Sequence, residues 1–310
     1  MTAPAIDPKR RTGPRKRPGA APRRVKYRLA PLALAGASIV LFGVFFLWPG
    51  SLGLIYSFTD YTGIGDFDFI GLANYEKLFG DPTFYLSLTR TLLFAAISVP
   101  LMYVMSLTIA SLLVSNHVKG KAGAKLVFFF PWLISPIVAG VIWRWMFGES
   151  FGFVNYALSQ LGGHPLAWQT DPNLALMVVV MASTWGGTAF NMLIFIAALK
   201  NVPRAYYEAA EIDGANAWQR FRFITLPSIA PTSFLVVLLS SLGAMKEFAM
   251  VQSLNGGGPG TSNTFLIQYI YETGFKRADI GYASAVSMVL LLILLTIAML
   301  QMWVNRRRAI

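Results

Sequence analysis

The sequence contains no cysteine and only two histidines, His117 and His164, which excludes several kinds of chemistry. A disulfide framework, an iron–sulfur cluster and a thiolate zinc site all require cysteine, and two distant histidines make a poor metal site. The GxxxxGK[ST] phosphate-binding loop, the HExxH zinc motif and the GxSxG nucleophile motif are also missing. We therefore expect no catalytic residue, no metal ligand and no cofactor in this chain, which is not expected to be an enzyme.

Charged residues are scarce, at 13% of the 310 residues, whereas 55% are hydrophobic and the mean hydropathy is +0.55. This composition is too apolar for a soluble globular protein. Six runs approach or exceed the roughly 20 apolar residues that a bilayer-spanning helix needs, and lipid offers the backbone no other hydrogen-bond partners. The runs are 29–56, 91–114, 126–147, 174–199, 228–245 and 280–304. We predict an all-α integral membrane protein with six transmembrane helices.

The distribution of basic residues predicts the orientation of these helices. Most of the 26 Lys and Arg residues lie in the tail 1–28, in the second and fourth loops and in the C-terminal tail 305–310. Cytoplasmic segments collect Lys and Arg, so we expect both termini to be cytoplasmic and the domain 29–304 to lie in the plasma (inner) membrane of a bacterium. The tail 1–28 is expected to be disordered and to contact anionic lipid. A nucleic-acid arm is the competing interpretation, but no folded nucleic-acid domain accompanies the tail.

The run 29–56 follows a basic segment, as a secretory signal would. Its apolar stretch is much longer than the core of about 7–15 residues in a signal peptide, so we expect an uncleaved first span. The next segment, 57–90, is expected to form an external surface cap with a short helix at 71–79. Several aromatic residues near span ends fit an interfacial belt; they are Tyr75, Trp132, Trp143, Trp145 and Trp168.

The fourth loop, 200–227, is too polar to span a membrane but strongly patterned. Pro203 can begin a helix and Gly214 can supply the left-handed residue that ends it. A second helical stretch follows around Trp218, and Pro227 begins the next span. A short helix rigidly joined to a span is suited to passing motion to a cytoplasmic partner, although amphipathic packing alone would give the same pattern.

The spacing of this loop resembles the EAA-x3-G-x9-I-x-LP signature of permease subunits of bacterial ABC importers. Here the signature reads Glu208-Ala209-Ala210, Gly214, Ile224 and Leu226-Pro227. Three further segments are similar to the carbohydrate-uptake, maltose-transporter-like branch, and to its first permease in particular. They are Gly71-Leu72-Ala73-Asn74-Tyr75, Asp213-Gly214-Ala215 and Asn255-Gly256-Gly257-Gly258-Pro259.

This resemblance implies a coupling role and a set of partners. The EAA loop of the family docks in a cleft of the ATPase subunit, which makes Glu208, Ala209, Ala210, Asp213 and Gly214 the expected ATPase-coupling residues. A second homologous permease, an ATPase dimer that binds ATP and Mg, and an external solute-binding protein are the expected partners. The expected cargo is a sugar or oligosaccharide, and no nucleic acid is expected.

A translocation path needs sparse polar and aromatic groups on helix faces that look inward. In the fourth run Ser183, Gly187 and Phe190 stand at i, i+4 and i+7, and Gly186 and Asn191 adjoin them. The fifth run repeats the pattern with Ser240, Gly243, Ala244 and Glu247. Maltose-type permeases contact substrate from these two helices, so the resemblance supports a substrate path. The alternative is close helix packing through small residues.

The competing function is a secondary, ion-coupled transporter of small solutes. Such a carrier is expected to have buried carboxylates and two matching broken-helix repeats, neither of which is clear in this sequence. The pattern does not identify the solute: an oligosaccharide, a monosaccharide derivative and glycerol phosphate all remain open. It also does not identify the partner subunits or the share of substrate contacts that each permease makes.

Overall fold

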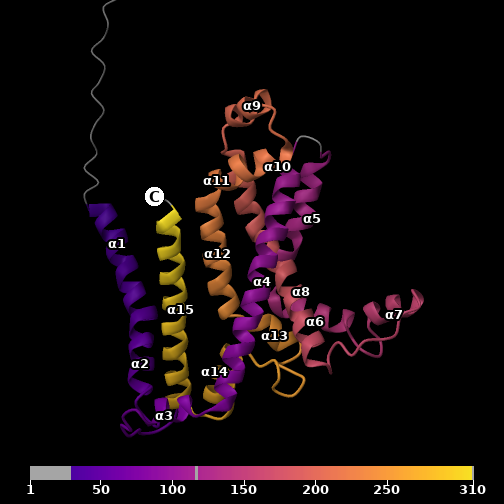
Figure 1. The fold of residues 1–310 in the computed structure, drawn as a ribbon. Helices are drawn as coiled ribbons and strands as arrows, with labels where there is room; N and C mark the ends of the chain where they lie inside the picture. Colours follow the sequence, from indigo (N-terminus) through magenta and orange to yellow (C-terminus); the bar gives the residue numbers. More distant parts are fainter. Residues whose placement is uncertain (1–28, 116–117, 309–310) are drawn as a thin grey trace, which may run out of the picture. The chain divides into compact units, whose positions relative to one another are not determined.

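The computed structural model describes residues 29–115 and 118–308. The predicted tail 1–28, His117 and the last two residues of the predicted tail 305–310 lie outside this part. The described residues form helices joined by turns, and the one β-type pairing among them is an isolated bridge between Thr59 and Phe69 (Figure 1). Residues up to Gly50 and residues from Ser51 onward form two compact units.

The first unit holds most of one long apolar helix. It comprises α1 (Leu29–Phe42), a π-helical segment η1 (Gly43–Leu47) and the start of α2 (Trp48–Tyr56). Residues from Pro31 to Tyr56 are long and apolar enough to cross a membrane. The predicted first span, 29–56, is confirmed as a continuous apolar helix.

Three long helices of the second unit also pass the length and hydropathy test for a membrane span. They are α4 (Pro82–Val114), α8 (Pro172–Lys200) and α15 (Ile280–Arg308). Both α4 and α8 begin with Asp-Pro. Asp81 Oδ1 accepts from the amide of Thr83 at 2.8 Å, and Asp171 Oδ1 accepts from the amides of Asn173 and Leu174. Such an acidic cap, followed by a proline that lacks the first amide hydrogen, explains why both helices start before their apolar runs.

The third predicted span, 126–147, is not one continuous helix. It consists of α5 (Lys121–Leu133) and α6 (Pro136–Met146), which meet at 98°. Ser135 has the extended ψ of 136° that the residue before a proline favours, so Pro136 ends α5 and starts α6 in a new direction. The prediction of a straight helix through Ile134 and Ser135 is therefore wrong.

The fifth predicted span, 228–245, is also part of a bent pair. The short helices α10 (Ala217–Arg220) and α11 (Leu226–Ser228), joined by the π-helical segment η2 (Phe221–Thr225), meet α12 (Ala230–Met245) at 70°. The described residues thus contain four candidate spans, or up to six if each bent pair counts as one.

The core of the second unit is built around α4 and α8, which pack along each other. Val179 and Ala182 of α8 and Phe94 of α4 are fully buried in one apolar cluster, and Met192 and Phe195 of α8 are buried in another. α12 crosses α4, and Tyr103 Oη lies 3.0 Å from Ser233 Oγ between these two helices. α8 is the most buried of the candidate spans, so it forms the centre of this unit.

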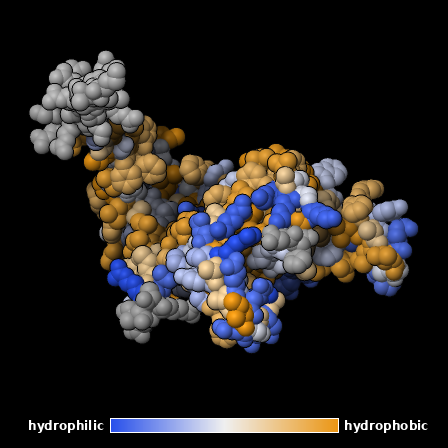
Figure 2. Space-filling model, turned by 90° about the horizontal axis from the view of Figure 1, so that it is seen from above, coloured by the Kyte–Doolittle hydropathy of each residue, from blue (hydrophilic) through white to orange (hydrophobic). Residues whose placement is uncertain are grey.

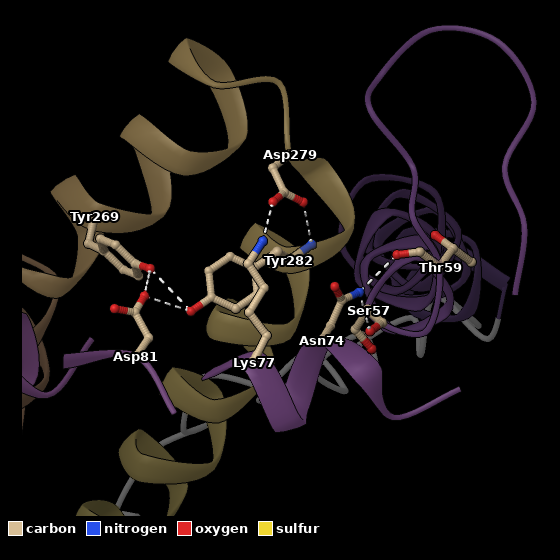
Figure 3. Close-up of polar contacts among 8 residues, drawn as sticks. All are labelled: Ser57, Thr59, Asn74, Lys77, Asp81, Tyr269, Asp279 and Tyr282. Carbon is tan, nitrogen blue, oxygen red and sulfur yellow. Dashed lines mark hydrogen bonds and ion pairs between the residues drawn. The ribbon is translucent and has the colours of Figure 1, made fainter. Parts of the chain in front are cut away.

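A polar network joins the segments at the end of this unit opposite α9 (Figure 3). Here α3 (Ala73–Phe79), α14 (Leu266–Tyr271) and the π-helical η3 (Glu272–Lys276) meet the start of α15. Asp81 Oδ2 accepts hydrogen bonds from the phenols of Tyr269 and Tyr282, and Lys77 Nζ lies 2.7 Å from Asp279 Oδ2. Asn74 donates to the carbonyls of Ser57 and Thr59 at 3.0 and 2.8 Å. The expected helical cap at 71–79 is present, and its side chains hold it in place.

Three short helices complete the fold. α7 (Phe153–Gln160) lies in the loop after α6, α9 (Arg204–Ile212) in the loop after α8, and α13 (Ala249–Leu254) after α12. α13 packs against α6 and α8. Seen from the α9 end, hydrophilic residues gather on this end of the unit (Figure 2), as a surface exposed to water requires.

Candidate functional site

A cavity of ≈ 530 Å³ lies among α5, α6, α8 and α12. All nine residues predicted for the substrate path line it. From α8 they are Ser183, Gly186, Gly187, Phe190 and Asn191, and from α12 and the residues that follow it they are Ser240, Gly243, Ala244 and Glu247. The sequence predicts two rows of residues, or stripes, one on each of two helices. Both stripes therefore line the same cavity.

Aromatic side chains form one wall of this cavity. Trp132 of α5 stacks on Phe190 of α8, with ring centroids 4.8 Å apart and an interplanar angle of 22°, and Trp185 also lines the space. Trp132 was predicted in an interfacial belt; in the structure it also lines the cavity, which the sequence analysis did not predict. The break after α5 turns this end of the helix toward α8, and the signal for it was the sequence Pro131-Trp132 followed closely by Pro136.

The polar groups of the cavity are few. Asn191 Nδ2 donates to Ser240 Oγ at 2.9 Å and so joins α8 to α12. Ser183 is 6% exposed, and its Oγ has no hydrogen-bond partner among the described residues. Glu247 Oε1 accepts from the amides of Phe248 and Met250 at 3.1 and 3.2 Å. These bonds fix the carboxylate in the cavity wall.

The glycines of the cavity differ in what surrounds them. A Cβ added at Gly186 or Gly243 would meet no atom within 4 Å. At Gly187 it would lie 2.8 Å from Met102 Sδ of α4, which is too close for a real contact. Gly187 therefore also permits the close approach of α4 and α8, as the packing interpretation of small residues predicts.

The segment with the EAA spacing forms a short helix that ends at a glycine. α9 begins after Pro203, and Gly214 has φ of +77°. The amide of Ala215 donates to the Ala210 carbonyl at 2.8 Å and that of Gly214 to the Glu211 carbonyl at 3.1 Å. This pair of bonds is a Schellman motif, which needs a left-handed residue where Gly214 stands. The predicted helix start and the predicted positive φ are both confirmed.

The predicted coupling residues lie on the surface of this segment. Glu208, Ala209, Asp213 and Gly214 are exposed, and Ala210 is half-buried. Among the described residues no hydrogen bond or ion pair involves the side chains of Glu208 and Asp213, so such contacts give no reason for an EAA sequence there. The described structure thus leaves these residues free for a contact outside the chain.

Side chains outside the EAA signature tie α9 to the membrane helices. Tyr207 Oη lies 2.9 Å from Thr225 Oγ1 in η2, and Arg220 forms an ion pair with Glu211. Asn216 and Gln219 form a reciprocal capping box at the start of α10. The sequence analysis missed Tyr207 and Thr225, because a hydrogen bond across 18 residues leaves no periodic signal.

The loop 148–171 folds around two polar side chains. Asn155 Oδ1 accepts from the indole of Trp168 at 2.9 Å, and Glu149 Oε1 accepts from the amides of Gln169 and Thr170. The hydrogen bond from the Gln169 amide is the main reason why the pKa of Glu149 lies below its ordinary value. Trp168 is buried, so its predicted place in an interfacial belt is wrong.

Two curated proteins that resemble this chain over most of its length are named as transport permeases. The lactose transport system permease protein LacF of Rhizobium radiobacter is 34% identical over 277 residues, which cover 87% of this chain and 92% of that protein. The sn-glycerol-3-phosphate transport system permease protein UgpA of Yersinia pestis is 32% identical over 275 residues, covering 87% and 92%. Both named relatives are transport permeases.

A solved structure has the same fold. A chain of a bacterial ABC transporter involved in the import of the acidic polysaccharide alginate superposes with a TM-score of 0.79 at 24% identity, over 91% of this chain and 97% of that chain. The family described as the binding-protein-dependent transport system inner membrane component matches residues 87–309. This range contains the cavity and the α9 segment, and the chain belongs to the family of binding-protein-dependent transport system inner membrane components.

Proposed function

We propose that this chain is the membrane-spanning permease subunit of an ATP-driven ABC importer for a sugar or oligosaccharide. The observation that carries the proposal is the cavity among α5, α6, α8 and α12, in a chain whose relative LacF is named for lactose transport. The cavity combines stacked aromatic rings with a few fixed polar groups, which suits a ligand with both C–H faces and hydroxyl groups.

The cavity is open on the side of its aromatic wall. Trp132 and Phe190 are 50% and 38% exposed. A second homologous permease is proposed to cover this side and to complete the path, and an external solute-binding protein delivers the cargo. A resolved alginate importer is described in complex with a periplasmic binding protein, which supports this type of partner.

The position of α9 supports the coupling role. It is joined directly to α8, which lines the cavity, and the Tyr207–Thr225 contact connects it to η2, which leads into α12. Glu208, Ala209, Ala210, Asp213 and Gly214 are proposed to dock on an ATPase dimer, which binds ATP and Mg. Closure of the ATPases then moves α9, and α8 and α12 move with it, so that the cavity opens alternately to the two sides.

The end that carries α9 is proposed to face the cytoplasm, where the ATPase is found. Lys200, Arg204, Arg220 and Arg222 lie in this loop, as expected for a cytoplasmic segment. The competing function of an ion-coupled carrier is not favoured, since relatives over most of the chain are permeases of binding-protein-dependent systems.

Transport by the reconstituted system tests the proposal. The chain, its partner permease and the ATPase are placed in liposomes with the solute-binding protein, and uptake of labelled mono-, di- and trisaccharides is measured with ATP or with a non-hydrolysable analogue. We expect uptake in the presence of ATP and no uptake with the non-hydrolysable analogue. Uptake that continues without the ATPase and stops when the proton gradient is dissipated would support the ion-coupled carrier instead.

A further inference from the structure

The charge of the cavity restricts what it can carry. Among the residues that line it, Glu247 is the one charged side chain, and none is Lys or Arg. The adjacent Lys246 is exposed and does not line the cavity. The wall that this chain contributes therefore carries one carboxyl group and no basic side chain that could pair with an anion.

The carboxylate of Glu247, which lines the cavity, has one oxygen without a hydrogen-bond partner among the described residues. Glu247 uses Oε1 for the amides of Phe248 and Met250, and no described residue bonds its Oε2. A carboxylate oxygen without a partner is poorly satisfied where water is partly excluded, and a ligand hydroxyl that donates to Oε2 would satisfy it.

The aromatic wall adds a surface for a sugar ring. Trp132 and Phe190 are stacked on each other beside Trp185. Such rings attract C–H groups and cations, but their negative faces repel anions. A carboxylate or phosphate on the cargo would meet both these faces and the Glu247 carboxylate.

We propose that this cavity accepts uncharged carbohydrates and rejects anionic ones. The inference rests on the proposed function and narrows it, because the relatives include both a lactose and a glycerol-phosphate permease. An anionic group that enters this space finds no cation on this wall to replace its hydration, and the ionised form of Glu247 repels it. The same repulsion does not act on a neutral sugar, whose hydroxyls are donors to the carboxylate.

Equilibrium binding to the purified permease–ATPase complex tests this without the selectivity of the solute-binding protein. The probes are labelled neutral mono-, di- and trisaccharides of hexoses and pentoses, each paired with its uronic-acid counterpart, together with glycerol phosphate. We expect the best neutral probe to bind at least about tenfold more tightly than its uronate. Equal or tighter binding of a uronate or of glycerol phosphate would overturn the inference while leaving the proposed function intact.

Two variants assign the selectivity to this carboxylate. Glu247→Gln keeps an acceptor oxygen but removes the charge, so the preference for the neutral probe is expected to fall about tenfold. Glu76→Gln, an exposed site outside the cavity, is the matched control and should not change it. An unchanged preference in Glu247→Gln would also overturn the inference. Failure of the complex both to bind any carbohydrate and to take one up with ATP would instead reject the proposed function.

Discussion

The phenol oxygen of Tyr207 lies 2.9 Å from the hydroxyl oxygen of Thr225 and so links α9 to the segment that leads into α12. Thr225 is buried, and its hydroxyl also donates to the Arg220 carbonyl at 3.4 Å, so Tyr207 is the closer of its two partners. The contact therefore connects the proposed ATPase-docking helix to the cavity by a second route, besides the direct connection of α9 to α8.

Replacement of Tyr207 by Phe should weaken coupling more than assembly. Removal of one partly buried hydrogen bond costs about 1 kcal/mol, enough to loosen the link between α9 and η2. We expect the variant to retain the ATPase in a pull-down but to transport several-fold less cargo per ATP hydrolysed. Tyr206→Phe is the matched control, because Tyr206 is exposed and its phenol oxygen makes no hydrogen bond among the described residues. Equal ratios of uptake to hydrolysis in the two variants would contradict the prediction.

Gly214→Ala should reduce retention of the ATPase while the chain still inserts and folds. The glycine has φ of +77° and no atom within 4 Å of an added Cβ, so the cost is conformational, about 1 kcal/mol, and not steric within the chain. Gly162→Ala provides a control with the same strain, since Gly162 has φ of +80° and equally open surroundings in another loop. If both variants retain the ATPase equally well, Gly214 has no special role in docking.

Gly243→Trp should block uptake by filling the cavity. A Cβ at Gly243 meets no atom within 4 Å, so the indole can enter the open space without disturbing helix packing. Gly187 is a poorer choice, because its Cβ would press on Met102. Transport and ATPase retention are measured together, with Gly36→Trp on α1 as a variant of equal bulk outside the cavity. Normal uptake by Gly243→Trp would remove this cavity from the path.

The carboxylate of Asp81 should stabilise the protein in a pH-dependent way. Burial acts to raise its pKa, but hydrogen bonds from Tyr269, the Thr83 amide and Tyr282 outweigh burial and hold the pKa below the ordinary value of 3.8. The stabilisation is therefore complete above that value and is lost as pH falls through the lowered pKa. Asp81→Asn should cost about 1–2 kcal/mol at neutral pH, measured by thermal unfolding in detergent, and the difference should shrink in acid. Asp66→Asn, at an exposed site, should change little.

A reporter fused after Ile310 should be cytoplasmic, and one inserted near Gly162 should be external. The basis is the concentration of Lys and Arg in the tails and in the second and fourth loops. Alkaline phosphatase and a fluorescent protein, which are active on opposite sides of the membrane, report the two positions. Labels on the same side would rule out the six-span topology.

The sequence was sufficient to find the apolar spans and both cavity stripes. Ser183, Gly187 and Phe190 recur at helical spacing, and they share one face in the structure because α8 is one continuous helix. The run 126–147 was wrongly predicted as one helix, since an apolar run gives no sign of a change of axis and the axis turns by 98° after Leu133. Contacts between distant segments, such as Asn191 with Ser240, depend on how helices cross and leave no pattern in either one.

The break at Ile134 and Ser135 also determines which side of the chain can touch lipid. A helix that stops leaves backbone carbonyls at its end and amides at the next start outside the helical bonding pattern. Hydrocarbon cannot satisfy these groups, so a break at membrane depth must be covered by protein or water. The exposed leucines of α15, such as Leu292 and Leu295, carry no such requirement. The side with the break must therefore be shielded from the bilayer. An isolated copy of this chain would expose to lipid backbone groups that only a partner chain or water can hydrogen-bond.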